Sequence, residues 1–277
     1  MLVAVVAVPL LLLAFYQRSP VWTWLLVFPA SLLAMWELFA MTLPDQRDRI
    51  ASVIFGALTC AAYYWLNPAS TDAAWVRPLA AGHVHLVLAL AVIGPTLYYL
   101  FRYGDMATIA QRMAFTVFGI VYAGLLLTHV VEIDRDFPQG GDWVVFVLAC
   151  VWLGDTGAYF AGRFLGKHKL YPAVSPKKTW EGAIGGVLGS LVGGIAVKVI
   201  RLDDLRWIDV VLLTIPGAAL AQMGDLVESL IKRSTGVKDS GAILPGHGGI
   251  LDRIDAVLFF APWVYVYFSV SAALRAL

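Results

Sequence analysis

Long apolar runs dominate the 277-residue sequence and restrict the folds that it can adopt. Nine candidate segments lie near 1–16, 20–41, 50–66, 84–101, 113–131, 143–160, 180–200, 209–226 and 256–274. A helix needs about 20 apolar residues, with a range of roughly 17 to 25, to cross a bilayer. Charged residues make up only 14% of the chain, against about a quarter in soluble domains. We therefore predict an all-α polytopic integral membrane protein with about nine transmembrane helices.

The basic residues between these segments predict the orientation. The odd-numbered connections hold five of them, and the even-numbered connections hold thirteen. Cytoplasmic loops are enriched in Lys and Arg, so we expect the amino terminus in the cytoplasm and the carboxyl terminus outside. The two charge-dense connections, 161–179 and 227–255, then face the cytoplasm. Lys and Arg residues that bind a ligand would also be counted in this excess, although they do not indicate the orientation of the chain.

The sequence shows no fixed-period repeat, low-complexity tract or long linker. We expect one membrane domain over residues 1–277, with 1–142 mainly a scaffold and 143–277 the catalytic half. Residues 1–16 are expected to be a retained first span, because no basic residue precedes them and no small-residue cleavage pattern ends them. Glu37 and His129 are interpreted as satisfied buried or helix-end groups rather than ligands.

Two features of the composition exclude other classes of protein. The net charge is +1 and the basic residues are scattered, which argues against a nucleic-acid partner. Cys60 and Cys150 lie in apolar segments without metal-binding or redox spacing, so we interpret both as small buried hydrophobic side chains.

The stretch from Ser229 to Asp255 is polar and glycine-rich, although it lies between two apolar segments. Ionised groups are costly near hydrocarbon, so their presence indicates an ionic ligand. Four cations could neutralise a polyphosphate, namely Lys232, Arg233, Lys238 and Arg253. Glycines 246, 248 and 249 flank His247 and permit positive φ or a close approach of the backbone to an anion. A lone histidine more often satisfies a local hydrogen bond than binds metal.

Two carboxylates stand on opposite sides of this stretch. Asp225 and Asp252 lie next to the ends of consecutive antiparallel spans, so they could meet. Mg²⁺ accepts one or two protein carboxylates and completes its shell with water and phosphate oxygens. The pair therefore predicts a magnesium site.

Two further clusters lie in the catalytic half. Asp155 follows an apolar run and is a functional candidate by its position in a span; the alternatives are pairing with Arg163 or a helix break at the neighbouring glycines. Those glycines also fit close helix contact. The segment 175–182 begins Ser-Pro-Lys-Lys-Thr, in which Thr179 suits an N-cap. This segment either binds phosphate at the start of a helix or is a basic flank that attracts anionic lipid.

Known nucleotide and hydrolase motifs are missing from the sequence. It contains no Walker-type loop, dinucleotide-binding glycine pattern, nucleophile elbow or His-Glu-x-x-His pair. Metal-assisted chemistry on phosphates is favoured by elimination. A transporter with an ion path past Asp155 is the alternative from another class, but the charges cluster at one membrane face and the two halves are unlike.

The stretch 229–255 resembles the signature of phosphatidate cytidylyltransferases (CDP-diacylglycerol synthases). It reads Ser-x-x-Lys-Arg-x4-Lys-Asp-x-Gly-x3-Pro-x-His-Gly-Gly-x2-Asp-Arg-x-Asp. The blocks Gly-Asp-Thr-Gly-Ala-Tyr and Ser-Pro-Lys-Lys-Thr-Trp-Glu-Gly are also similar, so the resemblance covers roughly residues 150–255. It implies transfer of a cytidylyl group from CTP to phosphatidic acid at the cytoplasmic face of an inner membrane. A related CTP-dependent lipid kinase would share nucleotide, metal and topology.

The resemblance also implies roles for individual residues. Asp225 and Asp252 would hold Mg²⁺, with Asp255 as a further ligand, and the resemblance allows a second, monovalent cation nearby. Lys232 would act with Asp225 and Asp252 in catalysis. The residues expected to bind the nucleotide or the lipid are Asp155, Tyr159, Ser175, Lys177, Lys178, Thr179, Ser229, Arg233, Lys238, Asp239, His247, Gly248, Gly249 and Arg253. A homodimer is the default expectation for assembly.

Overall fold

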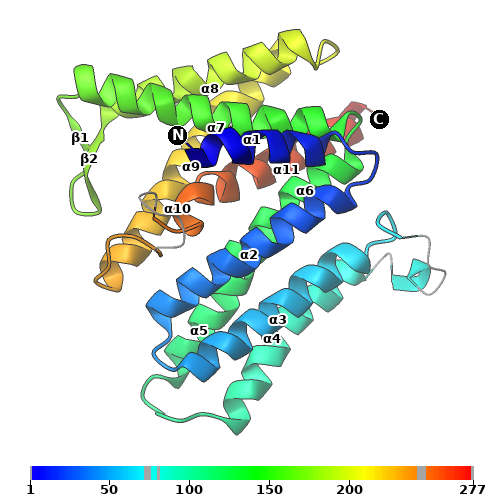
Figure 1. Cartoon of the computed structure of the whole chain (residues 1–277), viewed down its shortest axis with the longest axis vertical. Coiled ribbons are helices and arrows are strands. Elements are labelled where there is room, and N and C mark those ends of the chain that lie inside the picture. The colour runs from blue at the N-terminus through cyan, green and yellow to red at the C-terminus, as the bar shows by residue number, and fades with distance from the viewer. Residues whose placement is uncertain (1, 72–75, 80–81, 242–247, 276–277) are drawn as a thin grey trace. The chain divides into compact units, whose positions relative to one another are not determined.

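The computed structural model describes residues 2–71, 76–79, 82–241 and 248–275. These residues form helices and one short hairpin (Figure 1). The helices of the first half are α1 (Leu2–Phe15), α2 (Val21–Thr42), α3 (Gln46–Trp65), η1 (Arg77–Leu79), α4 (His83–Phe101), α5 (Ile109–Gly119), the π-helical η2 (Ile120–Leu125) and α6 (Leu126–Asp136). The second half contains α7 (Gly140–Phe164), β1 (Lys169–Tyr171), β2 (Ser175–Thr179), α8 (Trp180–Ile200), α9 (Trp207–Ser234), α10 (Leu251–Ile254) and α11 (Val257–Arg275).

The all-α membrane class predicted from hydropathy is confirmed. Each of the nine apolar segments coincides with a helix. Within the described residues, six helical stretches are long and apolar enough to cross a membrane: Val21–Thr42, His83–Phe101, Ile109–Asp136, Gly140–Phe164, Trp180–Ile200 and Trp207–Ser234. The helix α1 has only 14 residues, and the apolar stretch Val257–Ser271 is shorter than a typical span. Nine spans and the orientation of the termini stay predictions.

Contacts between residues divide the chain into two compact units. The first unit comprises Met1–Thr23, Glu132–Lys238 and Arg253–Leu277. The second unit comprises Trp24–Val131 and Asp239–Asp252. The second unit thus contains a piece of the polar stretch from the far end of the sequence. The single domain with a division at residue 142 stays a prediction.

In the first unit, α7 and α8 lie side by side with their backbones in contact (Figure 1). A Cβ atom on Gly157 would overlap the carbonyl oxygen of Gly185, and one on Gly189 would overlap the carbonyl oxygen of Leu153. Only glycine allows this approach, which is typical of small-residue interfaces between membrane helices. The helix α7 continues through Gly157 without a break. The close-contact interpretation of these glycines is therefore confirmed, and the helix-break alternative is wrong.

The helices α9 and α11 complete the core of the first unit. The ring of Phe260 covers Gly217, where a Cβ would lie only 2.7 Å from the ring. The indole Nε1 of Trp263 donates a hydrogen bond to the Leu213 carbonyl oxygen at 3.1 Å. This hydrogen bond satisfies the indole N–H group, which would be costly to bury without a partner.

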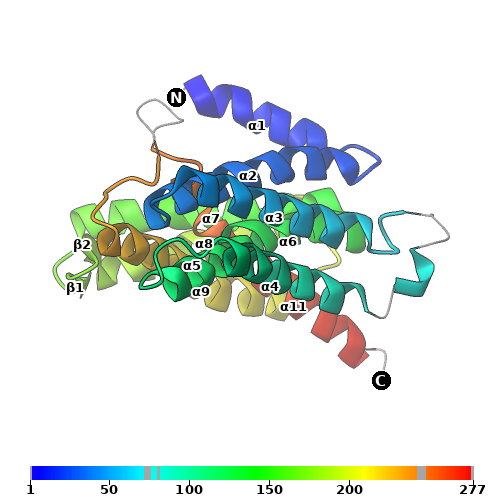
Figure 2. The ribbon, with the colours of Figure 1, turned by 90° about the horizontal axis from the view of Figure 1, so that it is seen from below.

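In the second unit, α3 packs beside α4 and η2. The contact between α3 and α4 can be followed in both views (Figure 1, Figure 2). Two of the unit's buried charges form a pair, because Arg112 donates to Asp48 at 2.8 Å. The His129 ring nitrogen Nδ1 lies 3.1 Å from the Leu126 carbonyl oxygen, as expected for a satisfied group. Cys60 here and Cys150 in the first unit are buried free thiols, which confirms their interpretation.

Candidate active site

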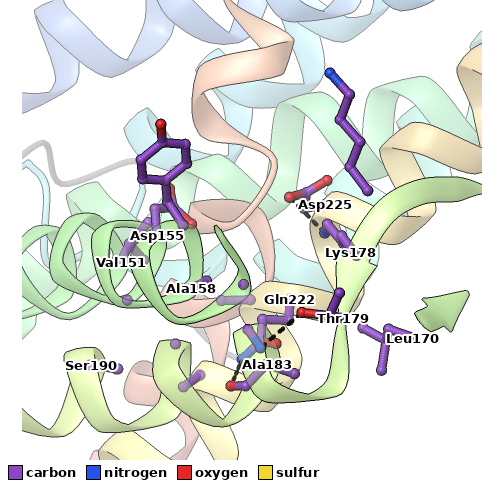
Figure 3. Close-up of a pocket in the computed structure, with 18 of the residues that line it drawn as sticks. Val151, Asp155, Ala158, Leu170, Lys178, Thr179, Ala183, Ser190, Gln222 and Asp225 are labelled. Atoms are coloured by element: carbon purple, nitrogen blue, oxygen red, sulfur yellow. Dashed lines mark hydrogen bonds and ion pairs between the residues drawn. The ribbon is translucent and has the colours of Figure 1, made fainter. Parts of the chain in front are cut away.

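A cavity of about 580 Å³ lies in the first unit among α7, α8, α9 and the hairpin (Figure 3). Its polar lining consists of Asp155, Tyr159, Arg163, Lys177, Lys178, Thr179, Ser190, Gln222 and Asp225. Its larger apolar lining side chains are Val151, Leu170 and Phe260. Most of the charged groups lie at the hairpin ends of the helices, whereas Val151 and Ser190 lie further into their spans. The cavity therefore has a charged end near the hairpin (its mouth) and a less charged end between the helices.

The hairpin between α7 and α8 carries the lysines of the mouth. Its strands pair antiparallel, with Lys169 opposite Thr179. Thr179 is the N-cap of α8, and its hydroxyl accepts from the Gly182 amide at 3.1 Å, which confirms the predicted cap. The Glu181 carboxylate accepts from the His168 amide at 3.2 Å and contacts the His168 ring at 2.6 Å. These bonds fix the hairpin against the first turn of α8.

Lys178 and Asp225 form the central ion pair of the cavity. The Lys178 Nζ lies 2.7 Å from Oδ2 of Asp225, and Figure 3 shows the two groups facing each other. The hydroxyl of Ser229, one turn later on α9, donates to the other Asp225 oxygen at 3.4 Å. The pair is partly exposed, with 24% and 37% of the two side chains accessible. Both groups are therefore open to a ligand in the cavity.

Two further carboxylates crowd Asp225. A Cβ at Gly224 would lie 2.6 Å from the Asp255 carbonyl oxygen, so α9 directly abuts this segment. Burial of the Asp255 carboxyl and the charge of Asp225 raise the pKa of Asp255 to about 8. Asp155 interacts electrostatically with Asp225, Lys178 and Arg253. This concentration of negative charge favours a cation.

The donor set fits a hard cation. Within the described residues, no group of three or more His, Cys, Asp or Glu side chains is arranged to hold a metal ion. Mg²⁺ needs only one or two protein carboxylates, because water and phosphate oxygens fill the rest of its shell. Asp225 and Asp255 supply oxygen donors of that kind, and a bound cation would offset the repulsion between the two carboxylates.

The predicted cations at the end of α9 have protein partners. Lys232 is buried and pairs with Glu228, one turn earlier on the helix. Arg233 is exposed and donates to the Val237 carbonyl oxygen at 3.2 Å. Lys238 is exposed, and Ser175 is partly exposed in β2.

The remaining predicted residues belong to the second unit or lie outside the described residues. The Asp252 oxygen Oδ2 accepts from the amides of Ser240 and Gly249 at 3.0 and 2.8 Å. Gly248 has φ +77°, which is one of the two roles predicted for these glycines. Asp239 is exposed. His247 lies outside the described residues.

Several predicted residues are thus brought together. Asp155, Tyr159, Lys177, Lys178, Thr179 and Asp225 line one cavity. The pairing of Asp225 with Asp252, and every assigned catalytic role, stay predictions.

The sequence interpretation missed Gln222, which donates to the Ala183 carbonyl oxygen at 3.1 Å in the cavity wall. The sequence feature that could have indicated Gln222 is its polar amide side chain within a long apolar span. Arg163 donates to the Tyr159 hydroxyl at 2.6 Å.

The model of the cytidylyltransferase family matches residues 1–271 of the chain. The chain belongs to the cytidylyltransferase family. The resemblance predicted from the stretch 229–255 is thereby confirmed. The cavity of this family member combines cations and carboxylates, which are groups that can bind phosphates and metal ions.

Curated relatives of this cytidylyltransferase family member carry a more specific name. Proteins called phosphatidate cytidylyltransferase are 44% identical over 150 residues in Staphylococcus saprophyticus and 40% identical over 155 residues in Bacillus subtilis. A third, from Brucella suis, is 42% identical over 154 residues. These matches cover 54%, 56% and 56% of this chain. They span little more than half the length of the relatives, at 56%, 58% and 57%.

Proposed function

We propose that the protein is a phosphatidate cytidylyltransferase, which joins CTP and phosphatidic acid to give CDP-diacylglycerol and diphosphate for phospholipid biosynthesis. The observation that carries the proposal is the Lys178–Asp225 pair in a cavity whose lining combines charged side chains with apolar ones. The names of the relatives support the choice of nucleotide and lipid. A cavity with both characters suits a lipid whose phosphate reacts while its chains remain among apolar residues.

The proposed reaction is a single in-line displacement. A phosphate oxygen of phosphatidic acid attacks the α-phosphorus of CTP and forms a new P–O–P bond. The bond from the α-phosphorus to the bridging oxygen of the β-phosphate breaks, and diphosphate leaves with the electron pair. A phosphomonoester has its second pKa at about 6, so the attacking oxygen is already largely deprotonated near neutral pH. No strong general base is required.

The residues of the chain then act by positioning and by neutralising charge. Lys178 and Lys177 line the cavity. In this proposal they bind phosphate oxygens as mobile point charges. Tyr159 and Asp155 line the route between the less charged end of the cavity and its mouth. Arg233, Lys232 and Arg253 are further candidates for the polyphosphate in this proposal.

Mg²⁺ is the proposed cofactor. Asp225 and Asp255 in the first unit, with Asp252, are the proposed ligands, and a second, monovalent cation nearby belongs to the same proposal. When bound, Mg²⁺ would neutralise phosphate charge and stabilise the leaving diphosphate. Ser229 supports Asp225 through their hydrogen bond.

We also propose the finer topology. Nine spans place the amino terminus and the active site in the cytoplasm and the carboxyl terminus outside, in the cell inner membrane, and the protein assembles as a homodimer. A variant without Cys60 and Cys150 permits a test by single cysteines. A membrane-impermeant maleimide added to intact cells should label Asp203→Cys and leave Lys169→Cys unlabelled. The reverse pattern would invert the topology.

Product identity tests the proposed activity. Purified protein is incubated with Mg²⁺, phosphatidic acid and CTP labelled on either the α- or the γ-phosphate. Label from the α-phosphate should enter lipid, and label from the γ-phosphate should remain in diphosphate. Transfer of the γ-label to a lipid alcohol would instead identify a CTP-dependent lipid kinase.

A further inference from the structure

Glu37 is a buried carboxyl group inside the apolar helix α2 of the second unit. Only 2% of the residue is exposed. One of its carboxyl oxygens accepts from the Ile250 amide at 3.0 Å, and the other accepts from the Leu251 amide at 2.8 Å. The second oxygen also accepts from the Ser240 hydroxyl at 3.1 Å. The group is thus hydrogen-bonded as a buried carboxylate must be.

All three donors come from the polar stretch 229–255, far from Glu37 in the sequence. The separation between Glu37 and Leu251 is 214 residues. Hydrogen bonds to a charged acceptor are roughly twice as strong as those between neutral groups. Glu37 therefore ties two ends of the segment 239–252 to one point on α2.

The fit between Glu37 and this segment is tight. A Cβ on Gly249 would overlap the Glu37 carboxyl and the Ser240 hydroxyl. A Cβ on Gly241 would lie 2.5 Å from the other Glu37 oxygen. The two glycines therefore allow the backbone on either side of the segment to approach the carboxyl group, which explains their place in the motif more directly than an anion contact does.

Ser240 links Glu37 to Asp252. Its hydroxyl oxygen lies 3.1 Å from a Glu37 oxygen and 2.9 Å from Oδ2 of Asp252. The hydroxyl hydrogen can be donated to only one of the two carboxyl groups at a time. The same Asp252 oxygen accepts from the Gly249 amide at 2.8 Å. The position of Asp252 therefore depends on the geometry that Glu37 imposes on its neighbours.

We propose that Glu37 is a positioning residue, which sets the orientation of the Asp252 carboxylate through Ser240, Gly249 and the start of α10. This inference rests on the proposed function, in which Asp252 is a metal ligand. Glu37 itself does not touch substrate, because protein atoms surround it. Its removal should leave nucleotide and lipid sites in place and disturb the use of Mg²⁺.

Glu37→Gln is the sharpest variant, because it keeps the volume of the side chain. An amide offers one acceptor oxygen and one NH₂ group, so one of the amides of Ile250 and Leu251 must lose its partner. We expect kcat to fall about tenfold and the Mg²⁺ concentration for half-maximal activity to rise severalfold, with little change in the KM for CTP. Glu37→Asp keeps the charge and should recover part of kcat.

Hydrogen exchange supplies a measurement that does not depend on activity. In full-length protein, the amides of Ile250 and Leu251 should exchange about tenfold faster in Glu37→Gln than in the unchanged protein. Ser31→Ala is the matched control, because Ser31 is buried on the same helix and its hydroxyl donates to the Val27 carbonyl oxygen. The control should retain the exchange rates, kcat and Mg²⁺ dependence.

Several outcomes would overturn the proposal. Unchanged exchange at Ile250 and Leu251 in Glu37→Gln would exclude the positioning contact. Faster exchange with an unchanged Mg²⁺ dependence would exclude its effect on Asp252. If Glu37→Gln does not fold, Ser240→Ala decides, because it removes the link and should raise the Mg²⁺ requirement. If unchanged protein makes no CDP-lipid, the proposed function fails, while the exchange rates still test the contact.

Discussion

Lys178 in β2 and Asp225 in α9 form an ion pair with 2.7 Å between Nζ and Oδ2, within a cavity whose lining combines charged side chains with apolar ones. The two residues come from different elements, and the capped start of α8 fixes the strand that carries the lysine. A partly exposed ion pair contributes little to stability. Its position at the cavity mouth therefore favours a role in binding or catalysis.

Lys178→Ala should reduce kcat/KM about a hundredfold, because a cation aimed at developing phosphate charge is lost. Lys178→Arg should restore only part of the rate, since a planar guanidinium differs in shape and hydration from an ammonium. Steady-state rates of CDP-lipid formation check both. Lys198→Ala is the control, because Lys198 lies at the opposite end of α8 and bonds to the Asp203 carbonyl oxygen. A Lys178→Ala enzyme with the rate of the control would contradict the assignment.

Lys177→Ala should raise the apparent KM for CTP or phosphatidic acid about three- to tenfold, with a smaller change in kcat. Lys177 lines the cavity but is exposed, so solvent screens its charge more than that of Lys178. The measurement is a KM for each substrate with the other saturating. If both KM values are unchanged, Lys177 is instead part of a basic flank that attracts anionic lipid.

Asp225→Asn should lower kcat at least about a hundredfold while the protein remains inserted in the membrane. The amide keeps the size of the side chain but removes a charged oxygen donor and the partner of Lys178. Asp204→Asn, at an exposed position, serves as the control. Activity and a thermal unfolding midpoint should be measured together. Loss of folding in Asp225→Asn alone would point to a structural role instead.

Removal of divalent metal should abolish activity reversibly. Chelator-treated protein should make no CDP-lipid, and added Mg²⁺ should restore the rate. Because Asp225 crowds Asp255, the Asp255→Asn variant should require more Mg²⁺ for half-maximal activity than the unchanged protein. Full turnover in the presence of excess chelator would exclude the proposed cofactor.

Gly157→Ala should destabilise the protein by about 1–3 kcal/mol, because the new methyl group would overlap the Gly185 carbonyl oxygen of the facing helix. The readout is the thermal unfolding midpoint in detergent. Gly82→Ala is the matched control, since a Cβ there meets no described residue within 4 Å and its φ is −124°. Equal midpoints in the two variants would show that α7 and α8 can separate without cost.

Hydropathy predicted most of the fold because it reports local composition. Every apolar segment became a helix, and Thr179 could be recognised as a cap from its position before an apolar run. The hairpin 169–179 was missed because its strands are short and polar and depend on bonds to Glu181. Glu37 could be interpreted as satisfied, but its partners more than 200 residues away could not be found.

The sequence by itself determined the membrane class and the family, and it supplied the candidate site residues. Apolar length and the spacing of a motif are properties of a single line of residues, so they can be read without the fold. Only the tertiary structure decided that Lys178 meets Asp225, that Asp155 and Asp255 crowd the same carboxylate, and that Glu37 binds the segment 239–252. These contacts depend on how each helix is rotated and how closely it packs, and glycine faces such as Gly157 against Gly185 set that packing between whole elements.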